Sequence, residues 1–285
     1  MKPRTPLELV RLAAGYLAEK GVSSPRLDAE VLLAHVLGVS RIRLYTEFDK
    51  PLEPAEVAAY REAVRRRARR EPVAYITGER EFWSLRLRVD PRVLIPRPET
   101  EVLVETCLAR MGAEGVLLDL GTGSGAVALA LLSERPGWRA VGVDLSAGAL
   151  EVARENARRL GLADRLDLRA GDLYGPVTGE RFDLVVSNPP YVPSAELDRL
   201  EPEVARYEPR GALDGGPDGL AVIRRIASGG RRHLRPGGSL VLEIGAGQGP
   251  AVRQVLEHAG LAGVQIVPDP AGRDRVAVGR LGPGP

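Results

Sequence analysis

Residues 119–125, DLGTGSG, are the first segment of this chain whose residue types and spacing suggest chemistry. They lie where a predicted strand over residues 116–120 gives way to a predicted helix. Glycine has no side chain, so backbone there can approach a ligand closely, and the N-terminus of the helix faces the same point. The segment therefore predicts a nucleotide-like cofactor at this turn. A tight turn without any ligand is the alternative.

Acidic side chains follow the next two predicted strands. Asp144 ends the first of them, and a carboxylate at that edge can accept hydrogen bonds from both hydroxyls of a ribose. Asp172 ends the second, where it would border an adenine ring and accept from its exocyclic amine. The glycine turn and Asp144 together favour a ligand site over a bare turn.

A second glycine-containing segment, residues 242–249 (LEIGAGQG), resembles the first, and Asp269 follows it at a similar interval. After Asp269, only about one short strand fits before the chain ends, which leaves no room for the rest of a cofactor domain. We therefore interpret this second glycine turn as structural.

Residues 188–191, NPPY, follow an apolar strand that is separated from the first glycine turn by two predicted strands. Ligands of open α/β sheets collect at the carboxyl ends of the strands near the topological switch, so Asn188 should face the same crevice as Gly121. The Asn188 side-chain carbonyl and the Pro189 backbone carbonyl can each accept one hydrogen of a planar NH2 group. Pro190 stiffens this backbone, and Tyr191 can stack on the amide. The alternative is a simple turn with Tyr191 as a core ring.

Two kinds of apolar periodicity predict the elements that position these residues. Amphipathic helices begin near Pro6, Pro25 and Pro54 and form a small bundle. The apolar stripe of the first helix consists of Leu7, Val10, Ala14 and Leu17.

After Pro72 the apolar residues recur at every second position, which is the period of a strand. Residues 73–76 and the alternation of Trp83, Leu85, Leu87 and Val89 therefore predict a β-hairpin linker. Further on, strands alternate with helices, which predicts an α/β fold with a doubly wound, mainly parallel sheet. The seven predicted strands cover residues 116–120, 140–144, 166–170, 182–187, 239–244, 264–267 and 276–278.

Composition excludes several classes of protein. The net charge is only +2 over 285 residues, so no strong overall field attracts nucleic acid or an anionic membrane. The single cysteine, Cys107, rules out a disulfide framework, and the three histidines have no ligand spacing, so we expect no metal. No apolar run suggests a membrane span or a targeting signal, and we expect a cytoplasmic protein. A basic run is formed by Arg61, Arg65, Arg66, Arg67, Arg69 and Arg70, which we interpret as a solvated helix face; contact with an acidic patch of a partner protein or with RNA phosphates is the alternative. The long connection over residues 192–217 is interpreted as a loop that closes over the substrate.

Read together, these segments resemble the class I, Rossmann-like methyltransferases, and more narrowly the protein-(glutamine-N5) methyltransferases of peptide chain release factors. The resemblance covers nearly the whole chain and is carried by residues 94–100 (LIPRPET), 119–125, 188–191, 207–213 (YEPRGAL) and 215–220 (GGPDGL). It implies a partner-binding helical bundle over residues 1–72, the β-hairpin linker over 73–97 and the methyltransferase domain over 98–285.

The resemblance also implies a reaction. S-adenosylmethionine would donate a methyl group, leaving S-adenosylhomocysteine, to the glutamine of a Gly-Gly-Gln motif in class 1 release factors, with no nucleic acid needed and a monomeric enzyme. The cofactor-binding residues would be Gly121, Thr122, Gly123, Ser124, Gly125, Asp144, Asp172, Leu173 and Asn188. The substrate would contact Asn188, Pro189, Pro190 and Tyr191, with Asn188, Pro189 and Tyr191 as the catalytic set. The main alternative is an amino-methyltransferase acting on an exocyclic base amine of RNA or DNA. A nicotinamide-dependent oxidoreductase and a non-catalytic binding protein are more distant alternatives.

Overall fold

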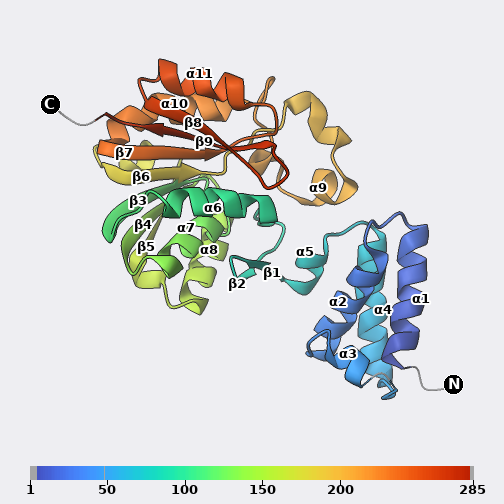
Figure 1. The fold of residues 1–285 in the computed structure, drawn as a ribbon. Coiled ribbons are helices and arrows are strands. Elements are labelled where there is room, and N and C mark those ends of the chain that lie inside the picture. The colour runs from blue at the N-terminus through green and yellow to red at the C-terminus, as the bar shows by residue number, and fades with distance from the viewer. Residues whose placement is uncertain (1–4, 48, 283–285) are drawn as a thin grey trace. The chain divides into compact units, whose positions relative to one another are not determined.

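The computed structural model describes residues 5–47 and 49–282, and its chain divides into two compact units. The first unit comprises Met1–Glu79 together with Glu201–Tyr207, and the second comprises Arg80–Leu200 together with Glu208–Pro285. The short segment Glu201–Tyr207 is thus separated in sequence from the rest of the unit that it belongs to (Figure 1).

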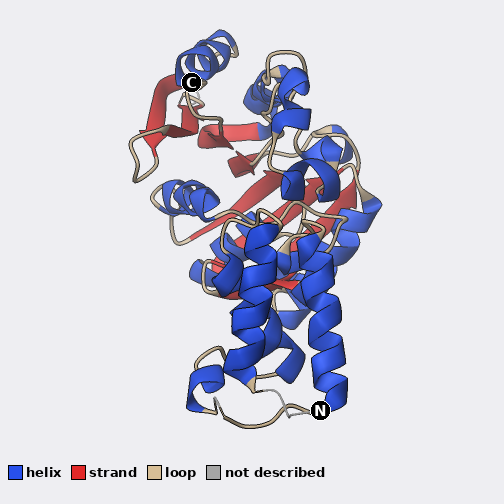
Figure 2. Cartoon of the chain, turned by 90° about the vertical axis from the view of Figure 1, so that its right-hand side faces the viewer, coloured by secondary structure: helices blue, strands red, loops and turns tan. Residues whose placement is uncertain are grey.

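The first unit is helical, as Figure 2 shows in blue. Its helices are α1 (Pro6–Glu19), α2 (Pro25–Leu37), α3 (Arg43–Thr46), α4 (Pro54–Ala68), α5 (Val73–Thr77) and, from the distant segment, α9 (Pro202–Tyr207). The three predicted helix starts are confirmed, because α1, α2 and α4 each begin at the expected proline. In α1 the predicted stripe is wrong in part: Val10 and Leu17 are buried, but Leu7 is exposed because Leu9 takes its place in the core.

Residues 73–76 form a helix, so the predicted strand there is wrong. Tyr75 and Ile76 are adjacent in sequence, yet both are buried. In a strand, neighbouring side chains point to opposite faces, whereas a short helix turned into a core can bury both. Pro72 lies at the start of α5 with a fixed φ of −57°, and Gly78 ends the helix in the left-handed region at φ 75°.

Three arginines on and after α4 form ion pairs inside the first unit, and two of them, Arg67 and Arg70, are largely withdrawn from water. Arg67 is only 4% exposed and donates to Asp28 at 2.7 Å and to Glu203 of α9 at 2.8 Å. Arg70 donates to the other oxygen of Glu203 at 2.6 Å, and Arg66 pairs with Glu71. The interpretation of this run as a solvated face is therefore wrong for Arg67 and Arg70, whose acidic partners lie outside the helix, whereas the Arg66 side chain stays partly exposed.

A β-hairpin is present, but only its second strand lies where the sequence predicts it, because the first strand follows the helix over residues 73–77. It consists of β1 (Glu79–Phe82) and β2 (Leu85–Arg88), which pair as a two-stranded sheet. Trp83 and Ser84 form the turn, with φ values of 51° and 57°. Leu87 and Val89 are fully buried, as the alternation predicts.

The second unit contains a seven-stranded sheet in the order β5-β4-β3-β6-β7-β9-β8. Its strands are β3 (Glu114–Leu120), β4 (Gly137–Asp144), β5 (Leu166–Ala170), β6 (Phe182–Ser187), β7 (Leu234–Glu243), β8 (Ala262–Pro268) and β9 (Asp274–Arg280). All pairings are parallel except those of β9. The order reverses between β3 and β6, which creates the topological switch. The predicted doubly wound, mainly parallel sheet is confirmed.

Helices cover both faces of this sheet. They are α6 (Glu101–Leu108), α7 (Ala126–Glu134), α8 (Ala147–Arg159), α10 (Ala221–His233) and α11 (Gly249–His258), with 3-10 turns at Pro98–Thr100, Ala163–Arg165, Gly175–Val177, Ser194–Arg199 and Arg210–Ala212. Among the described residues, none of the helices is both long and apolar enough to span a membrane.

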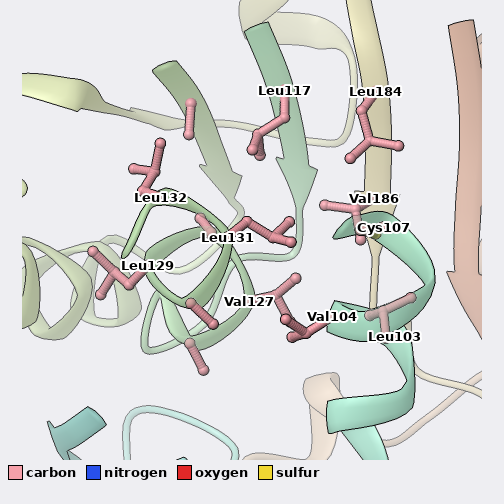
Figure 3. Close-up of a cluster of buried hydrophobic side chains, with 14 of the residues drawn as sticks. Leu103, Val104, Cys107, Leu117, Val127, Leu129, Leu131, Leu132, Leu184 and Val186 are labelled. Carbon is pink, nitrogen blue, oxygen red and sulfur yellow. The ribbon is translucent and has the colours of Figure 1, made fainter. Parts of the chain in front are cut away.

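The second unit has two hydrophobic cores, one on each face of the sheet, and alternate side chains of one strand belong to each. On β3, Leu117 belongs to the core under α6 and α7, whereas Leu118 belongs to the core under α10 and α11. Figure 3 shows the first of these cores, in which side chains of α6, α7 and the strands lie together, among them Leu103, Leu131 and Leu117. Cys107 is fully buried in this core, and burial raises the pKa of its thiol. The central strands are apolar on both faces, so the polar residues that follow their carboxyl ends are easily distinguished in the sequence.

Candidate active site

A cavity of about 510 Å³ lies at the carboxyl ends of β3, β4, β5 and β6 in the second unit. Nine residues that the sequence predicts for the site line it: Gly121, Thr122, Gly123, Ser124, Asp144, Asp172, Leu173, Asn188 and Pro190. Asn188 and Gly123 thus face one cavity, as the topology rule predicts. Gly125, Pro189 and Tyr191 do not line the cavity.

The first glycine turn leaves open space beside its backbone. Gly121 and Gly123 have φ values of 71° and 57°, in the left-handed region that favours glycine. A Cβ at Gly121 would meet nothing within 4 Å, and a Cβ at Gly123 would meet only a backbone oxygen at 4.0 Å. Gly125 differs, since a Cβ there would lie 3.1 Å from Leu129. The first two glycines leave room for a ligand, whereas the third allows close packing of α7.

Asp119 and Thr122 support this turn from below. Asp119 is 2% exposed and accepts a hydrogen bond from the Thr122 hydroxyl at 2.7 Å. Burial raises the pKa of Asp119 from 3.8 to about 6, although the hydroxyl of Thr122 and the backbone N–H of Ala128 oppose the rise. The carboxyl therefore titrates near neutral pH at the floor of the cavity.

Asp144 ends β4 and accepts two backbone hydrogen bonds. Gly123 donates to its Oδ2 at 2.8 Å, and Ser146 donates to its Oδ1 at 2.9 Å. The first bond joins Asp144 directly to the glycine turn. Since each carboxylate oxygen has two lone pairs, both oxygens can still accept from a ligand.

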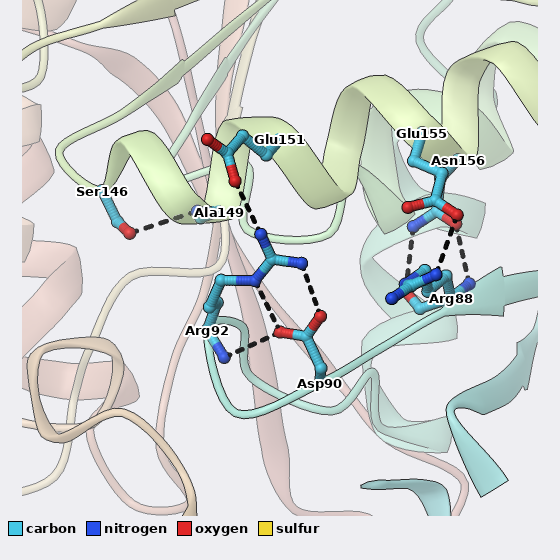
Figure 4. A network of polar contacts seen from close by, with 8 residues as sticks. All are labelled: Arg88, Asp90, Arg92, Ser146, Ala149, Glu151, Glu155 and Asn156. Carbon is cyan, nitrogen blue, oxygen red and sulfur yellow. Dashed lines mark hydrogen bonds and ion pairs between the residues drawn. The ribbon is translucent and has the colours of Figure 1, made fainter.

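The helix that follows Asp144 is fixed by the polar network of Figure 4. Ser146 caps α8 by accepting from Ala149 at 3.1 Å. Asn156, which is fully buried, donates to the carbonyl of Ser124 at 2.9 Å and to that of Arg88 at 3.0 Å. It thereby connects the first glycine turn to the β-hairpin. Asn156 carries no motif in the sequence, so sequence analysis missed it.

Asp172 and Leu173 border the cavity after β5. Leu173 has a φ of 47°, which is rare for a residue with a branched side chain. Asp172 accepts from the Arg225 side chain of α10 at 2.6 Å, and both side chains are more than half exposed. Arg225 also lines the cavity, a position that nothing in the sequence pattern of α10 indicates.

Asn188 follows β6 and is half-buried. Its Nδ2 donates to the hydroxyl of Thr100 at 3.3 Å, and Thr100 also lines the cavity. Tyr191 points away from the cavity into the second core, where its hydroxyl donates to Glu243 at 3.2 Å. Burial raises the pKa of Tyr191, and the neighbouring Glu243 adds to this rise.

Two segments near the cavity, residues 94–100 and 207–213, are tied together by Glu208. Glu208 is 6% exposed and accepts from the backbone of Ile95 at 3.1 Å and from the Arg97 guanidinium. Arg97 and Pro209 both line the cavity. The two sequence motifs thus form one wall, and a buried carboxylate holds them in register.

The second glycine turn and Asp269 are not part of the cavity. Asp269 accepts from the backbone of Ala271 and Arg273 and pairs with the side chain of Arg273 at 2.9 Å. These bonds close the loop between β8 and β9 and lower the pKa of Asp269 to about 2. The cavity is lined by neither the second glycine turn nor Asp269, which agrees with the interpretation of this turn as structural.

Comparison with known proteins identifies the family. Residues 8–78 match a family described as the PrmC N-terminal domain, and residues 98–200 match the methyltransferase small domain. A release factor glutamine methyltransferase of Geobacter sulfurreducens is 49% identical over 94% of this chain and 94% of its own length. One of Cereibacter sphaeroides is 48% identical over 96% of this chain and 98% of its own length. This chain belongs to the release factor glutamine methyltransferase family.

Solved structures of lower identity share the fold of this release factor glutamine methyltransferase family member. A methyltransferase from Pyrococcus furiosus has a TM-score of 0.53 and 19% identity, covering 70% of this chain and 89% of that one. A T. thermophilus 16S rRNA methyltransferase in complex with AdoMet and guanosine has a TM-score of 0.52 and 20% identity, covering 71% of this chain and 49% of that one. At these identities the likeness concerns the sheet and its helices.

Proposed function

We propose that this chain transfers a methyl group from S-adenosylmethionine to the side-chain amide nitrogen, N5, of the glutamine in the Gly-Gly-Gln motif of class 1 release factors. The observation that carries the proposal is Asn188, which lines the same cavity as the first glycine turn with its amide NH2 directed to Thr100. Its carbonyl oxygen is then available to a substrate. The name shared by relatives that match nearly the whole chain supports the same reaction.

The residues present suit S-adenosylmethionine. A cavity of about 510 Å³ lies within the range of small-molecule sites. The open space beside Gly121 and Gly123 suits the methionine part, together with Thr122, Ser124 and the adjoining Gly125. Asp144 would accept from the ribose hydroxyls, and Asp172 and Leu173 would flank the adenine. When bound, the cofactor supplies an electrophilic methyl group on a sulfonium sulfur.

The chain's own residues would present the glutamine amide in the orientation that transfer needs. An amide nitrogen is a poor nucleophile because its lone pair is delocalised. Asn188 Oδ1 and the Pro189 carbonyl would each accept one of its hydrogens, which fixes the plane of the amide and directs the nitrogen at the methyl carbon. Pro190 stiffens this backbone. The predicted stacking of Tyr191 on the amide is not part of this proposal, because its ring lies in the second core and does not line the cavity.

No base is needed before transfer in this proposal. The glutamine nitrogen becomes acidic only after it has bonded to the methyl carbon, and it then releases a proton to solvent. The acceptors at Asn188 and Pro189 are carbonyl oxygens, which can accept the two hydrogens of a planar amide. The partner would be a class 1 release factor in the cytoplasm, bound by a monomeric enzyme without nucleic acid. The helical residues 1–72 would supply docking surface.

Mass spectrometry after incubation with purified release factor tests this proposal. We expect one added methyl group on the glutamine of the Gly-Gly-Gln tripeptide and none on a release factor in which that glutamine is alanine. The Asn188→Ala variant should transfer more slowly by about 3 kcal/mol of activation free energy, with cofactor affinity changed less than tenfold. Methylation of added RNA, with no label in the release factor, would instead establish the base-amine alternative.

A further inference from the structure

The second glycine turn, residues 242–249 at the end of β7, packs around Tyr191. Glu243 Oε1 accepts from the Tyr191 hydroxyl at 3.2 Å, and Gln248 Nε2 donates to the Tyr191 carbonyl at 3.1 Å. A Cβ at Gly245 would lie 3.4 Å from Tyr191 Cδ2, so the ring packs against bare backbone. One turn therefore holds Tyr191 at its hydroxyl, its ring and its carbonyl.

Gln248 is itself fixed at both ends of its side-chain amide. Its Oε1 accepts from the backbone of Gly245 at 2.8 Å, so its Nε2 must face Tyr191. Gly219 makes room for this contact, because a Cβ there would lie 2.4 Å from the Tyr191 carbonyl oxygen and 2.8 Å from Gln248 Nε2. The segment 215–220 and the second glycine turn thus meet at the carbonyl of Tyr191.

Thr100 holds the other end of the segment 188–191. Asn188 Nδ2 donates to its hydroxyl oxygen at 3.3 Å, and Thr100 is 3% exposed. A hydroxyl can donate or accept, but the Thr100 hydrogen is directed to the Glu243 carboxyl, so its oxygen is left to accept from the NH2 of Asn188. Since an asparagine amide has its donors on one side and its acceptor on the other, this arrangement decides which way Oδ1 faces. Among the described residues, none donates to Asn188 Oδ1.

Glu243 connects the two ends. It is 1% exposed, and the groups that act on its carboxyl are the hydroxyls of Thr100 and Tyr191, the guanidinium of Arg275 and the carboxylate of Glu99. Burial and, to a smaller extent, Glu99 raise the pKa of Glu243, while the two hydroxyls and Arg275 oppose the rise. Its Oε2 has no partner within hydrogen-bonding distance in the part of the chain that the structure describes. Burying a carboxyl costs free energy, and fixing the geometry of the groups that it contacts is one role that offsets this cost.

We propose that Thr100, Glu243 and Gln248 are positioning residues that hold the segment 188–191 with Asn188 Oδ1 toward the cavity. This inference rests on the proposed function, because the group that Oδ1 would accept from is the NH2 of the substrate glutamine. An Asn188 amide turned over would present its own NH2 to that NH2, and the two donors would repel. Fixing the amide before the substrate arrives avoids this arrangement.

Two substitutions at Thr100 test the role of its hydroxyl. Thr100→Val keeps the shape and removes the hydroxyl, whereas Thr100→Ser keeps the hydroxyl. We expect the valine variant to lower kcat about 10- to 100-fold, the range expected when one buried hydrogen bond is lost. KM for the release factor and Kd for S-adenosylhomocysteine should stay within about threefold, and the serine variant should keep kcat within about threefold of wild type. A serine variant as slow as the valine variant would overturn the inference.

Gln248→Glu tests the other end and serves if the valine variant does not fold. It keeps an acceptor for Gly245 but places a second oxygen against the Tyr191 carbonyl in place of the donor. We expect kcat to fall about tenfold. Gln254→Glu, the same chemical change at an exposed position of α11, should leave kcat unchanged. Equal kcat values for the two variants would contradict the role of Gln248.

Failure of this inference can be separated from failure of the proposed function. If the wild type methylates the release factor and Thr100→Val is equally fast, the positioning role is wrong and the function stands. If the wild type does not methylate it, crystal structures of wild type and Thr100→Val decide the inference without activity. A rotated Asn188 amide in the variant would support it, and an unchanged amide would overturn it.

Discussion

Replacing Asp119 by asparagine should stabilise the ligand-free protein at neutral pH. The buried Asp119 carboxyl accepts from the Thr122 hydroxyl and from the backbone N–H of Ala128, and burial raises its pKa from 3.8 to about 6. Asparagine can make both contacts without a charge, because its Oδ1 can accept from Ala128 while its Nδ2 donates to the Thr122 oxygen. The substitution therefore removes the cost of ionising a buried group and preserves the hydrogen bonds.

The magnitude follows from the two pKa values. The difference between 3.8 and about 6 corresponds to about 3 kcal/mol. Because the folded state has the higher pKa, it binds the proton more tightly than the unfolded chain. The contribution of Asp119 to stability is therefore complete below pH 3.8 and is lost as the pH rises through about 6. The free energy of unfolding of the wild type should fall by about 3 kcal/mol across this window, relative to Asp119→Asn.

Urea unfolding of the two proteins at several pH values between about 4 and 8 measures this difference. Other titrating groups are common to both proteins and cancel in the comparison. Asp164→Asn, at an exposed position, serves as the control and should follow the wild type at every pH. A difference between wild type and Asp119→Asn that stays constant over the whole range would refute the reasoning, since it would show that Asp119 does not titrate in this window.

Three further predictions concern the cofactor site, the first unit and the core. Asp144→Ala should raise the dissociation constant of S-adenosylhomocysteine at least about tenfold, measured by calorimetry, and an unchanged constant would remove Asp144 from the site. Glu203→Ala should lower the free energy of unfolding by about 3 kcal/mol, because it leaves the buried Arg67 short of a partner; the exposed neighbour Glu201→Ala should cost far less. Leu129→Ala, at a fully buried position, should cost about 2 to 5 kcal/mol in the same denaturation assay, and a cost below about 1 kcal/mol would show that the core collapses around the gap.

The sheet and the location of the cavity could be predicted because their signals are local. Each strand of the second unit is an apolar run, and alternation with helices leaves few topologies. The rule that ligands lie beyond the carboxyl ends of parallel strands then places Gly123 and Asn188 together, although 65 positions separate them (188 − 123). The roles of these residues stay predictions until they are measured.

Other features could not be predicted because they depend on partners far away in the sequence. Residues 73–76 have an apolar pattern that suits a strand or a buried helix, and only the core around Tyr75 and Ile76 decides between them. Arg67 looks like a surface residue until Glu203, 136 positions later, is placed beside it. Asn156 is a single polar residue within the helix α8, so no local pattern distinguishes it from a solvent-facing position.

The assignment of Glu201–Tyr207 to the first unit has a consequence for synthesis. A nascent chain is made from its N-terminus, so α4 leaves the ribosome with its buried guanidinium long before its carboxylate partner has been translated. Until then Arg67 has Asp28 but lacks Glu203. The N-terminal helices therefore acquire their last ion pairs only after four strands of the sheet, β3 to β6, have been synthesised. A fragment that ends at residue 79 should accordingly be less stable than the same helices in the intact chain.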